Sequence, residues 1–309
     1  MIEKLLISKK CFKLVLGAGN EDIHSIEKLM KVYYEAGCRF FDLCMDERVA
    51  NIAKETCPDA YFCFSYGIKD DPHTIKAKIN PSKCTGCLCC ENVCIQNAIS
   101  NGFINETKCI GCKQCISICH NNAIQTYSKT KNLKEVLPKI LKYNPQCIEL
   151  HATSANDKEV ENNWNYISQH YSGIMSLCID RSILGDIGII TKIKKLIEER
   201  KPYTTIIQAD GNPMSGGADD YKTTLQAVAM AEVIQKNKMP VYLLLSGGTN
   251  SKTKELANLC QVDINGISIG SYARKIVKPY IEQENFEENK TLFNQAVETA
   301  KNLINSTYI

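Results

Sequence analysis

Nine of the seventeen cysteines in this 309-residue chain fall within one short segment. Eight of the nine form two runs with the same spacing, C-x2-C-x2-C-x3-C, and a matching phrase follows each run, IQNAI or HNNAI. The segment is therefore an internal duplication. The two runs are Cys84, Cys87, Cys90 and Cys94, and then Cys109, Cys112, Cys115 and Cys119.

This spacing is typical of bacterial ferredoxins that bind two [4Fe–4S] clusters. In that pattern, three cysteines of a run bind one cluster within a tight loop, and the fourth binds the cluster of the other run. The spacing thus predicts one cluster on Cys84, Cys87, Cys90 and Cys119, and a second on Cys94, Cys109, Cys112 and Cys115. Gly86 and Gly111 occupy equivalent positions, where they would let backbone amides approach the clusters.

The segment departs from the ferredoxin pattern in two ways. Ile95 and His120 follow the fourth cysteines, where proline is usual, and Cys89 is an extra thiol. We interpret Cys89 as a bystander that could replace Cys90. A pair of zinc sites is the alternative, but zinc usually takes two separated C-x-x-C pairs. Such clusters pass single electrons, and a purely structural role for them is the other alternative.

The overall composition is typical of a soluble protein in a reducing compartment. Apolar residues make up 44% and charged residues 23%, and the net charge of +3 gives no reason to expect nucleic acid or a membrane as a partner. The start, MIEKLLISKK, does not resemble an export signal, and no run approaches the roughly 20 apolar residues that span a bilayer. We therefore expect a cytoplasmic protein whose remaining cysteines are mostly core residues.

Outside the cysteine segment, short apolar runs alternate with segments of helical spacing. The predicted strands span 12–19, 39–44, 61–67, 147–153, 174–180, 204–211, 240–248 and 266–272. The predicted helices span 22–36, 47–56, 132–143, 157–170, 186–200, 219–237, 251–260 and 286–305.

This strict alternation of strands and helices predicts a parallel sheet that is buried on both faces. Eight such units in roughly 250 residues match a TIM (β/α)8 barrel, and an open doubly wound α/β sheet is the alternative. No G-x-G-x-x-G follows the first strand. The barrel would comprise residues 1–68 and 130–309. The cysteine segment, 69–129, would be a ferredoxin-like insert in the loop after the third strand, over the barrel mouth.

Polar residues that follow the predicted strands would meet at the C-terminal face of the barrel, where active sites of this fold lie. We interpret Asp210, in QADGNPMSGG, as a candidate base or hydrogen-bond anchor, and Asp42 and His151 as further catalytic candidates. Together they indicate a small-molecule pocket, although each residue alone can equally be structural. The same face would receive Cys44, Asp46, Asp180 and Arg181.

Glycine-rich turns follow the last two predicted strands. They contain Ser246, Gly247, Gly248 and Thr249 in one turn, and Gly270 and Ser271 in the other. Many barrels bind phosphate at this position through backbone amides. The turns therefore predict a phosphate-bearing ligand or a flavin, with tight turns alone as the alternative. Arg274 could hold an anion or lie on the surface.

Several phrases, taken in order along the chain, resemble one known family. GAGNEDI, the two cysteine runs, QADGNPMSGG, LLSGGTN and GISIGSYARK are similar to the light-dependent period A proteins of cyanobacteria. They are also similar to a related barrel-only reading frame of algal plastids. The resemblance spans most of the chain and implies an iron–sulfur, redox-responsive protein. That family is linked to redox sensing for the circadian clock, but nothing in this sequence indicates a clock role.

Three functions are consistent with these features. An electron-transfer protein would pass electrons from a donor protein to a ligand at the barrel mouth or to a partner enzyme, such as one with radical chemistry. A reductase would act on a phosphorylated or flavin-bearing small molecule, and a flavin would convert single-electron steps into a hydride-like step. A redox sensor or scaffold would bind a protein partner, and an exposed apolar patch near the clusters would favour it.

Overall fold

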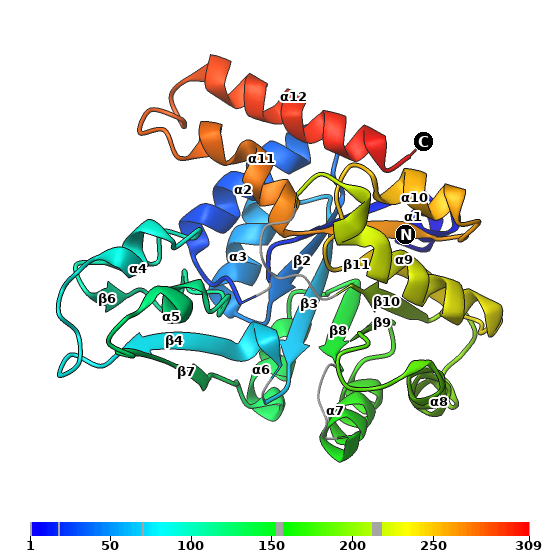
Figure 1. Cartoon of the computed structure of the whole chain (residues 1–309). Coiled ribbons are helices and arrows are strands. Elements are labelled where there is room, and N and C mark those ends of the chain that lie inside the picture. Colours follow the sequence, from blue (N-terminus) through cyan, green and yellow to red (C-terminus); the bar gives the residue numbers. More distant parts are fainter. Residues whose placement is uncertain (1, 18, 70, 153–156, 212–217, 309) are drawn as a thin grey trace.

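The barrel is closed and entirely parallel (Figure 1). The computed structural model describes residues 2–17, 19–69, 71–152, 157–211 and 218–308. The strands follow the order β1-β2-β3-β8-β9-β10-β11-β12, and β12 pairs back with β1. The predicted TIM barrel is therefore confirmed over the open sheet. The strands are β1 (Cys11–Val15), β2 (Phe40–Cys44), β3 (Tyr61–Gly67), β8 (Cys147–His151), β9 (Ile174–Ile179), β10 (Thr205–Asp210), β11 (Tyr242–Ser246) and β12 (Gly266–Ile269).

Eight helices around the barrel overlap the eight predicted helices. They are α2 (Ile23–Glu35), α3 (Glu47–Thr56), α6 (Leu133–Leu141), α7 (Asp157–His170), α8 (Asp186–Ile197), α9 (Tyr221–Lys236), α10 (Thr253–Leu259) and α12 (Lys290–Ser306). Asp46, Asn132, Asp220 and Asn289 each accept a backbone hydrogen bond in the first turn of the helix that follows. Such caps satisfy amides that the helix leaves free and so fix where it begins. None of the described helices is both long and apolar enough to cross a membrane.

Outside the insert, the sequence pattern does not predict two further helices, α1 (Ile2–Ile7) and α11 (Ser271–Ile281). The phrase GISIGSY predicts a strand over 266–272, but β12 ends at Ile269 and α11 begins two residues later. The strand prediction was wrong at 271–272, because the short phrase does not show where the strand ends and the helix begins. The other helix, α1, packs Ile2 and Leu6 against the barrel interior at the N-terminal ends of the strands.

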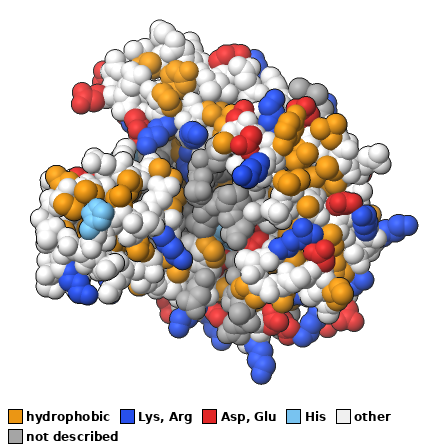
Figure 2. All heavy atoms as spheres, in the orientation of Figure 1, with side chains coloured by type: hydrophobic (Ala, Val, Ile, Leu, Met, Phe, Trp, Pro, Cys, Tyr) orange, Lys and Arg blue, Asp and Glu red, His pale blue; other side chains and the backbone are white. Residues whose placement is uncertain are grey.

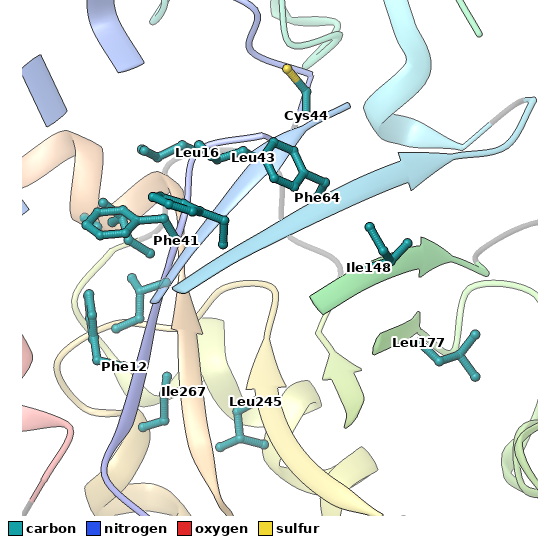
Figure 3. Close-up of a cluster of buried hydrophobic side chains, with 14 of the residues drawn as sticks. Phe12, Leu16, Phe41, Leu43, Cys44, Phe64, Ile148, Leu177, Leu245 and Ile267 are labelled. Atoms are coloured by element: carbon teal, nitrogen blue, oxygen red, sulfur yellow. The ribbon is translucent and has the colours of Figure 1, made fainter. Parts of the chain in front are cut away.

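Side chains alternate between the two faces of each barrel strand, and the outward ones form the main core. Phe12, Phe41, Phe64, Leu177 and Leu245 belong to one buried cluster with the apolar sides of the helices (Figure 3). The inward side chains near the N-terminal ends of the strands form a second apolar cluster. Its strand residues are Cys11, Phe40, Cys63, Cys147, Ile174, Ile206, Tyr242 and Leu244. Burial of both strand faces explains why these strands have nearly continuous apolar sequences.

The cysteine segment leaves the barrel after β3 and forms a separate lobe beside it (Figure 1). After η1 (Pro72–Thr74), β4 (Ile75–Ile79) pairs antiparallel with β7 (Ile124–Ser128), so the insert begins and ends side by side. This pairing anchors the insert at the barrel, between the third and fourth barrel strands. Between β4 and β7 lie α4 (Cys89–Asn92), β5 (Ile99–Ser100), β6 (Phe103–Ile104) and α5 (Gln114–Ile118).

Candidate functional site

The eight cysteines of the two runs line two separate cavities in the insert. One cavity is lined by Cys84, Cys87, Cys90 and Cys119, with Cys89 beside them. The other cavity is lined by Cys94, Cys109, Cys112 and Cys115. Each set combines three cysteines of one run with the fourth of the other, as a two-cluster ferredoxin requires. The assignment of individual ligands stays a prediction, and the thiol-lined cavities fit two [4Fe–4S] clusters.

The two cysteine loops repeat the same backbone conformation. Gly86 and Gly111 have φ angles of 68° and 69°, and Leu88 and Lys113 have φ angles of 59° and 65°. The glycines differ in their surroundings, because a Cβ atom on Gly111 would lie 2.3 Å from the carbonyl oxygen of Ile75, whereas a Cβ on Gly86 would meet nothing within 4 Å. Gly111 therefore serves both the turn and the close approach of its loop to β4, and Gly86 serves the turn alone.

Backbone amides point at the fourth cysteine of each run. The amide of Ala98 donates a hydrogen bond to Cys94 Sγ at 3.2 Å, and the amide of Ala123 donates to Cys119 Sγ at 3.3 Å. Hydrogen bonds to cluster sulfurs favour their negative charge and help to set the reduction potential. These bonds are a second feature that fits a cluster in each cavity.

A buried ionic network fills the middle of the barrel. Lys13 Nζ lies 2.9 Å from Asp42 Oδ2 and 2.6 Å from Glu149 Oε2, and all three side chains are almost fully buried. Ser176 Oγ also donates to Glu149 Oε2, at 2.8 Å, and the Gln208 side-chain amide donates to the same oxygen. Buried charges of this kind persist only when they are paired and hydrogen-bonded.

Two histidines continue this network towards the barrel mouth. His151 Nε2 lies 3.1 Å from Glu149 Oε1, and His151 Nδ1 lies 3.9 Å from Asp71 Oδ2. His73 Nδ1 lies 2.9 Å from the other oxygen of Asp71. The two imidazole rings meet edge to face, with centroids 4.3 Å apart. A line of acidic and basic groups therefore runs from the barrel centre to its mouth.

Opposite charges in this network stabilise one another, whereas burial and the nearby Glu149 carboxylate raise the pKa of Asp42. Burial alone would lower the pKa of Lys13, but the Asp42 and Glu149 carboxylates outweigh burial and raise that pKa well above its ordinary value. Burial works against ionised Glu149, yet Lys13 and His151 lower its pKa. Burial would also lower the pKa of His151, and the carboxylates of Asp71 and Glu149 raise it to about 9. Lys13 is therefore held as an ammonium, which makes it an electrostatic group and not an amine nucleophile.

The structure brings the three predicted catalytic candidates into one barrel interior. Asp42 contacts Lys13, and His151 contacts Glu149. Asp210 accepts a hydrogen bond from Cys178 Sγ at 3.3 Å. Their chemical roles stay a prediction.

Sequence reasoning missed four ionisable members of the network: Lys13, Asp71, His73 and Glu149. A signal existed for two of them. Lys13 in FKLVL and Glu149 in CIELH are single charges within strands predicted to be buried on both faces, and such charges need a partner. Asp71 and His73 lie in the insert segment, where the cysteine spacing is the dominant signal.

Of the other polar residues expected at the mouth, Cys44 lines a pocket there and the rest have structural partners. Asp46 caps α3 and pairs with Lys131 at 3.2 Å. Asp180 Oδ1 accepts a hydrogen bond from the Ser182 amide at 2.9 Å. Arg181 pairs with Asp186 at 2.9 Å.

A small pocket of about 70 Å³ opens at the mouth above this network. Lys76, on β4 of the insert, lines this pocket and joins the insert to the barrel, because its buried Nζ donates to the carbonyl oxygens of Gly19, at 2.6 Å, and of Cys109, at 2.7 Å. The backbone of one predicted cluster ligand is therefore tied directly to the barrel mouth. The lining includes Gly17, Cys44, Ser65, Gly67, His73, Lys76, Lys131 and His151.

A larger cleft of about 790 Å³ separates the insert from α2 and α11. Positively charged side chains predominate in its lining, and Figure 2 shows Lys and Arg side chains gathered where the two lobes meet. The buried Asn20 Nδ2 and the Arg274 Nε atom have no hydrogen-bond partner among the residues that the structure describes. The basic residues are Lys28, Lys108, Arg274, Lys275 and Lys278, and the acidic ones are Asp22, Glu282 and Glu284.

The phosphate candidates lie in two different settings. Gly270 precedes α11, whose first residue, Ser271, lines the large cleft beside Arg274. The lining of that cleft does not include the turn from Ser246 to Thr249, in which Gly247 and Gly248 have positive φ angles. Thr249 Oγ1 donates to the carbonyl oxygen of Ser268, so this hydroxyl supports the neighbouring strand. Phosphate binding at either turn stays a prediction.

Fold and site together define an iron–sulfur protein, a parallel (β/α)8 barrel that carries a duplicated ferredoxin-type module in the loop after its third strand. Residues 77–100 and 103–125 match the 4Fe-4S binding domain family, which agrees with two [4Fe–4S] clusters and a redox function. Residues 139–306 match the family described as the light dependent period A C-terminal domain. The chain belongs to this family. It is also 28% identical to the light dependent period A protein of Synechococcus elongatus, over 95% of this chain and 90% of that protein.

Solved structures with a similar arrangement are distant in sequence. The YdjI aldolase from Escherichia coli K12 is 8% identical, with a TM-score of 0.48, over 98% of this chain and 92% of that one. The KDPG aldolase from Legionella pneumophila is also 8% identical, with a TM-score of 0.47, over 97% and 96% of the two chains. At these values the likeness gives no information about activity, and the barrel assignment comes from the strand order of this chain.

Proposed function

We propose that this protein relays single electrons between a protein partner at the outer end of the insert and a ligand bound where the insert meets the barrel. The observation that carries this proposal is the difference in exposure between the two cysteine sets. Cys87 of the first set is exposed, whereas Cys109 and Cys115 of the second set are buried. The first set therefore suits exchange with an external partner, and the second suits exchange with the barrel.

Features at the two ends of the insert support this direction. Leu88, which lines the first cavity, is 47% exposed, and Phe103 of the insert is 78% exposed. Surfaces that bind another protein include exposed apolar side chains of this kind. At the inner end, Lys76 joins Cys109 to Gly19, and Cys94 and Cys109 lie next to residues that line the large cleft.

A comparison of two variants tests the relay. Cys84→Ser removes a predicted ligand of the outer cluster, and Cys109→Ser removes one of the inner cluster. Each variant should retain about four of the eight iron atoms of two [4Fe–4S] clusters. Dithionite, a small donor, should reduce the remaining cluster in both variants. Reduced flavodoxin, a protein donor, should reduce the Cys84→Ser variant at least about tenfold more slowly than the Cys109→Ser variant. Equal rates with flavodoxin, or clusters that dithionite cannot reversibly reduce, would contradict the proposal.

The large cleft favours a second candidate, a reductase that acts on a phosphate-bearing small molecule or uses a bound flavin. Its volume lies in the range of small-molecule sites. The N-terminal end of α11, at Ser271, faces the cleft together with Arg274, and both a helix N-terminus and a guanidinium bind phosphate well. The unpartnered amide of Asn20 adds a donor. These groups lie beside the loop that carries Cys94.

Calorimetric titration of the anaerobic holoprotein with FMN, and separately with inorganic phosphate, tests this candidate. Lys275→Met removes one exposed charge from the cleft lining and should weaken binding by about fivefold or more. Lys290→Met, at the exposed start of α12, is the matched control and should leave binding unchanged. Failure of the unaltered protein to bind either probe would exclude a phosphate site in this cleft.

A further inference from the structure

Three potential metal ligands converge at the barrel mouth from two adjacent strands. His151 is the last residue of β8, and it lies opposite Gly67, the last residue of β3. Asp71 and His73 follow β3 in the first turn of the insert. One ligand atom from each of the two histidines and the carboxylate lies within 4.8 Å of the others. The parallel pairing of β3 and β8 therefore creates the cluster, which no spacing along the sequence reveals.

The hydrogen bond to Glu149 fixes which nitrogen of His151 is available. The carboxylate oxygen Oε1 of buried Glu149 lies 3.1 Å from His151 Nε2, so this nitrogen is engaged with Glu149. The other nitrogen, Nδ1, is buried and has no hydrogen-bond partner within the described part of the chain. It faces Asp71 Oδ2 across 3.9 Å. His151 Nδ1 and this carboxylate oxygen therefore border the same space, where one cation would contact both atoms.

We propose that Asp71, His73 and His151 bind one divalent first-row transition metal ion such as Fe²⁺. Two imidazoles and one carboxylate form the donor set of many catalytic zinc and non-haem iron sites, which keep further positions open. Glu149 is the outer carboxylate that orients a ligating histidine in such sites. Neither the 4Fe-4S nor the light dependent period A match concerns these three residues as a ligand set.

The surrounding backbone leaves room for the ion. The mouth pocket of about 70 Å³ is lined by His73 and His151, and this volume accommodates an ion with about two water-sized ligands. Gly67 also forms part of the pocket wall. A Cβ atom there would lie 2.8 Å from Thr74 Cγ2 and 3.4 Å from Asp71 Oδ1, so a larger residue would push the carboxylate away. The site is thus open to the pocket, and the absence of a side chain at Gly67 leaves space for the Asp71 carboxylate.

One alternative explains the same geometry without a metal. A protonated His151 would sit as an imidazolium between Asp71 and Glu149, so that the three groups form a buried ion pair network. The metal site and the imidazolium differ in one measurable quantity, the number of divalent ions that the protein retains. The metal site does not depend on the proposed electron relay, since metal content is measured without any electron donor.

Metal analysis of the reconstituted holoprotein distinguishes the metal site from the imidazolium. The protein, with clusters of natural-abundance iron, is incubated anaerobically with ⁵⁷Fe²⁺, Mn²⁺ or Zn²⁺ in separate samples, desalted, and examined by mass spectrometry. We expect one additional equivalent of ⁵⁷Fe²⁺ per chain, with a high-spin Fe²⁺ Mössbauer doublet distinct from the clusters. His151→Gln and Asp71→Asn should each lower the retained ⁵⁷Fe²⁺ at least about tenfold and keep the cluster iron unchanged, which shows that the variants are folded.

The matched control is His170→Gln, because this exposed histidine at the end of α7 forms a hydrogen bond with the Tyr166 carbonyl of its own helix. It should retain the full equivalent of ⁵⁷Fe²⁺. Retention of none of the three ions by the unaltered protein would overturn the metal site and support the imidazolium. Equal retention by the His151→Gln variant would overturn it as well, because the bound ion would then lie elsewhere.

Discussion

Lys13 Nζ lies 2.6 Å from Glu149 Oε2 inside the barrel, and about 1% of each side chain is exposed. The two residues are 136 positions apart in the sequence, on β1 and β8. Asp42 and His151 contact the same pair, so this ionic contact is the centre of the polar layer. Breaking it should therefore affect the whole barrel and not only one strand.

Lys13→Met should destabilise the folded protein by ~3–5 kcal/mol, because it leaves two carboxylates buried without their cation. Urea unfolding of the anaerobic holoprotein measures this change. Lys9→Met is the matched control, since Lys9 and Asp263 also form a 2.6 Å pair but have half or more of their side chains exposed. That variant should lose less than about 1 kcal/mol. Similar losses of stability in both variants would show that burial does not increase the contribution of the Lys13 pair to stability.

Gly111→Ala should disrupt the inner cluster site, whereas Gly86→Ala should be tolerated better. Both positions need a positive φ, but only at Gly111 would a Cβ atom collide with the Ile75 carbonyl. We expect Gly111→Ala to lose about four iron atoms per chain and Gly86→Ala to retain about eight. Iron analysis and electron paramagnetic resonance of the reduced proteins measure this difference. Equal cluster loss in the two variants would mean that the positive φ angle, and not the collision with Ile75, causes the loss.

Cys89→Ser should keep both clusters, and Cys90→Ser should lose the outer one. Cys89 lines the same cavity as the predicted ligands, but its Sγ lies 3.7 Å from the Cys87 carbonyl and its position falls outside the repeated spacing. Iron content after anaerobic reconstitution tests this assignment. If the Cys90→Ser variant kept its full iron content, Cys89 would be able to replace Cys90 as a ligand.

Lys76→Met should make the inner cluster more sensitive to oxygen. The change leaves the carbonyl oxygens of Gly19 and Cys109 without their shared donor, at a cost of about 1–3 kcal/mol for each unsatisfied group. The insert should then separate more readily from the barrel mouth. Bleaching of the visible absorbance in air should be faster for about half of the iron. Lys78→Met, two residues along β4 with an exposed side chain, is the control and should bleach like the unaltered protein.

The sequence predicted the features that rest on local patterns. The alternation of apolar runs and helical segments predicted the barrel, because each strand and helix shows its own periodicity. The duplicated cysteine spacing predicted two cluster sites, and the two thiol-lined cavities contain the expected groups of four. Where two elements follow each other closely, as β12 and α11 do, the same patterns placed the boundary wrongly.

The candidate site depends on contacts between distant parts of the chain, and the sequence predicted it only in part. Asp42 and His151 were predicted because Asp42 lies in the second barrel strand and His151 ends the fourth, but their partners Lys13 and Glu149 were not. Nothing in the spacing of Asp71 and His73 indicates that His151 lies beside them. The same holds for the large cleft, where Ser271 and Arg274 of the barrel face Gln96 and Lys108 of the insert.

The sequence by itself thus determined the number of barrel units, the place of the insert and the two sets of cluster ligands to be tested. Only the tertiary structure decided that Lys13 pairs with Glu149, that His151 faces Asp71, and that the inner cysteine set is tied to the barrel through Lys76. The physical reason is the range of the interactions. Strand periodicity and cysteine spacing are properties of neighbouring residues, whereas a buried charge finds its partner only when the closed sheet brings separate strands together.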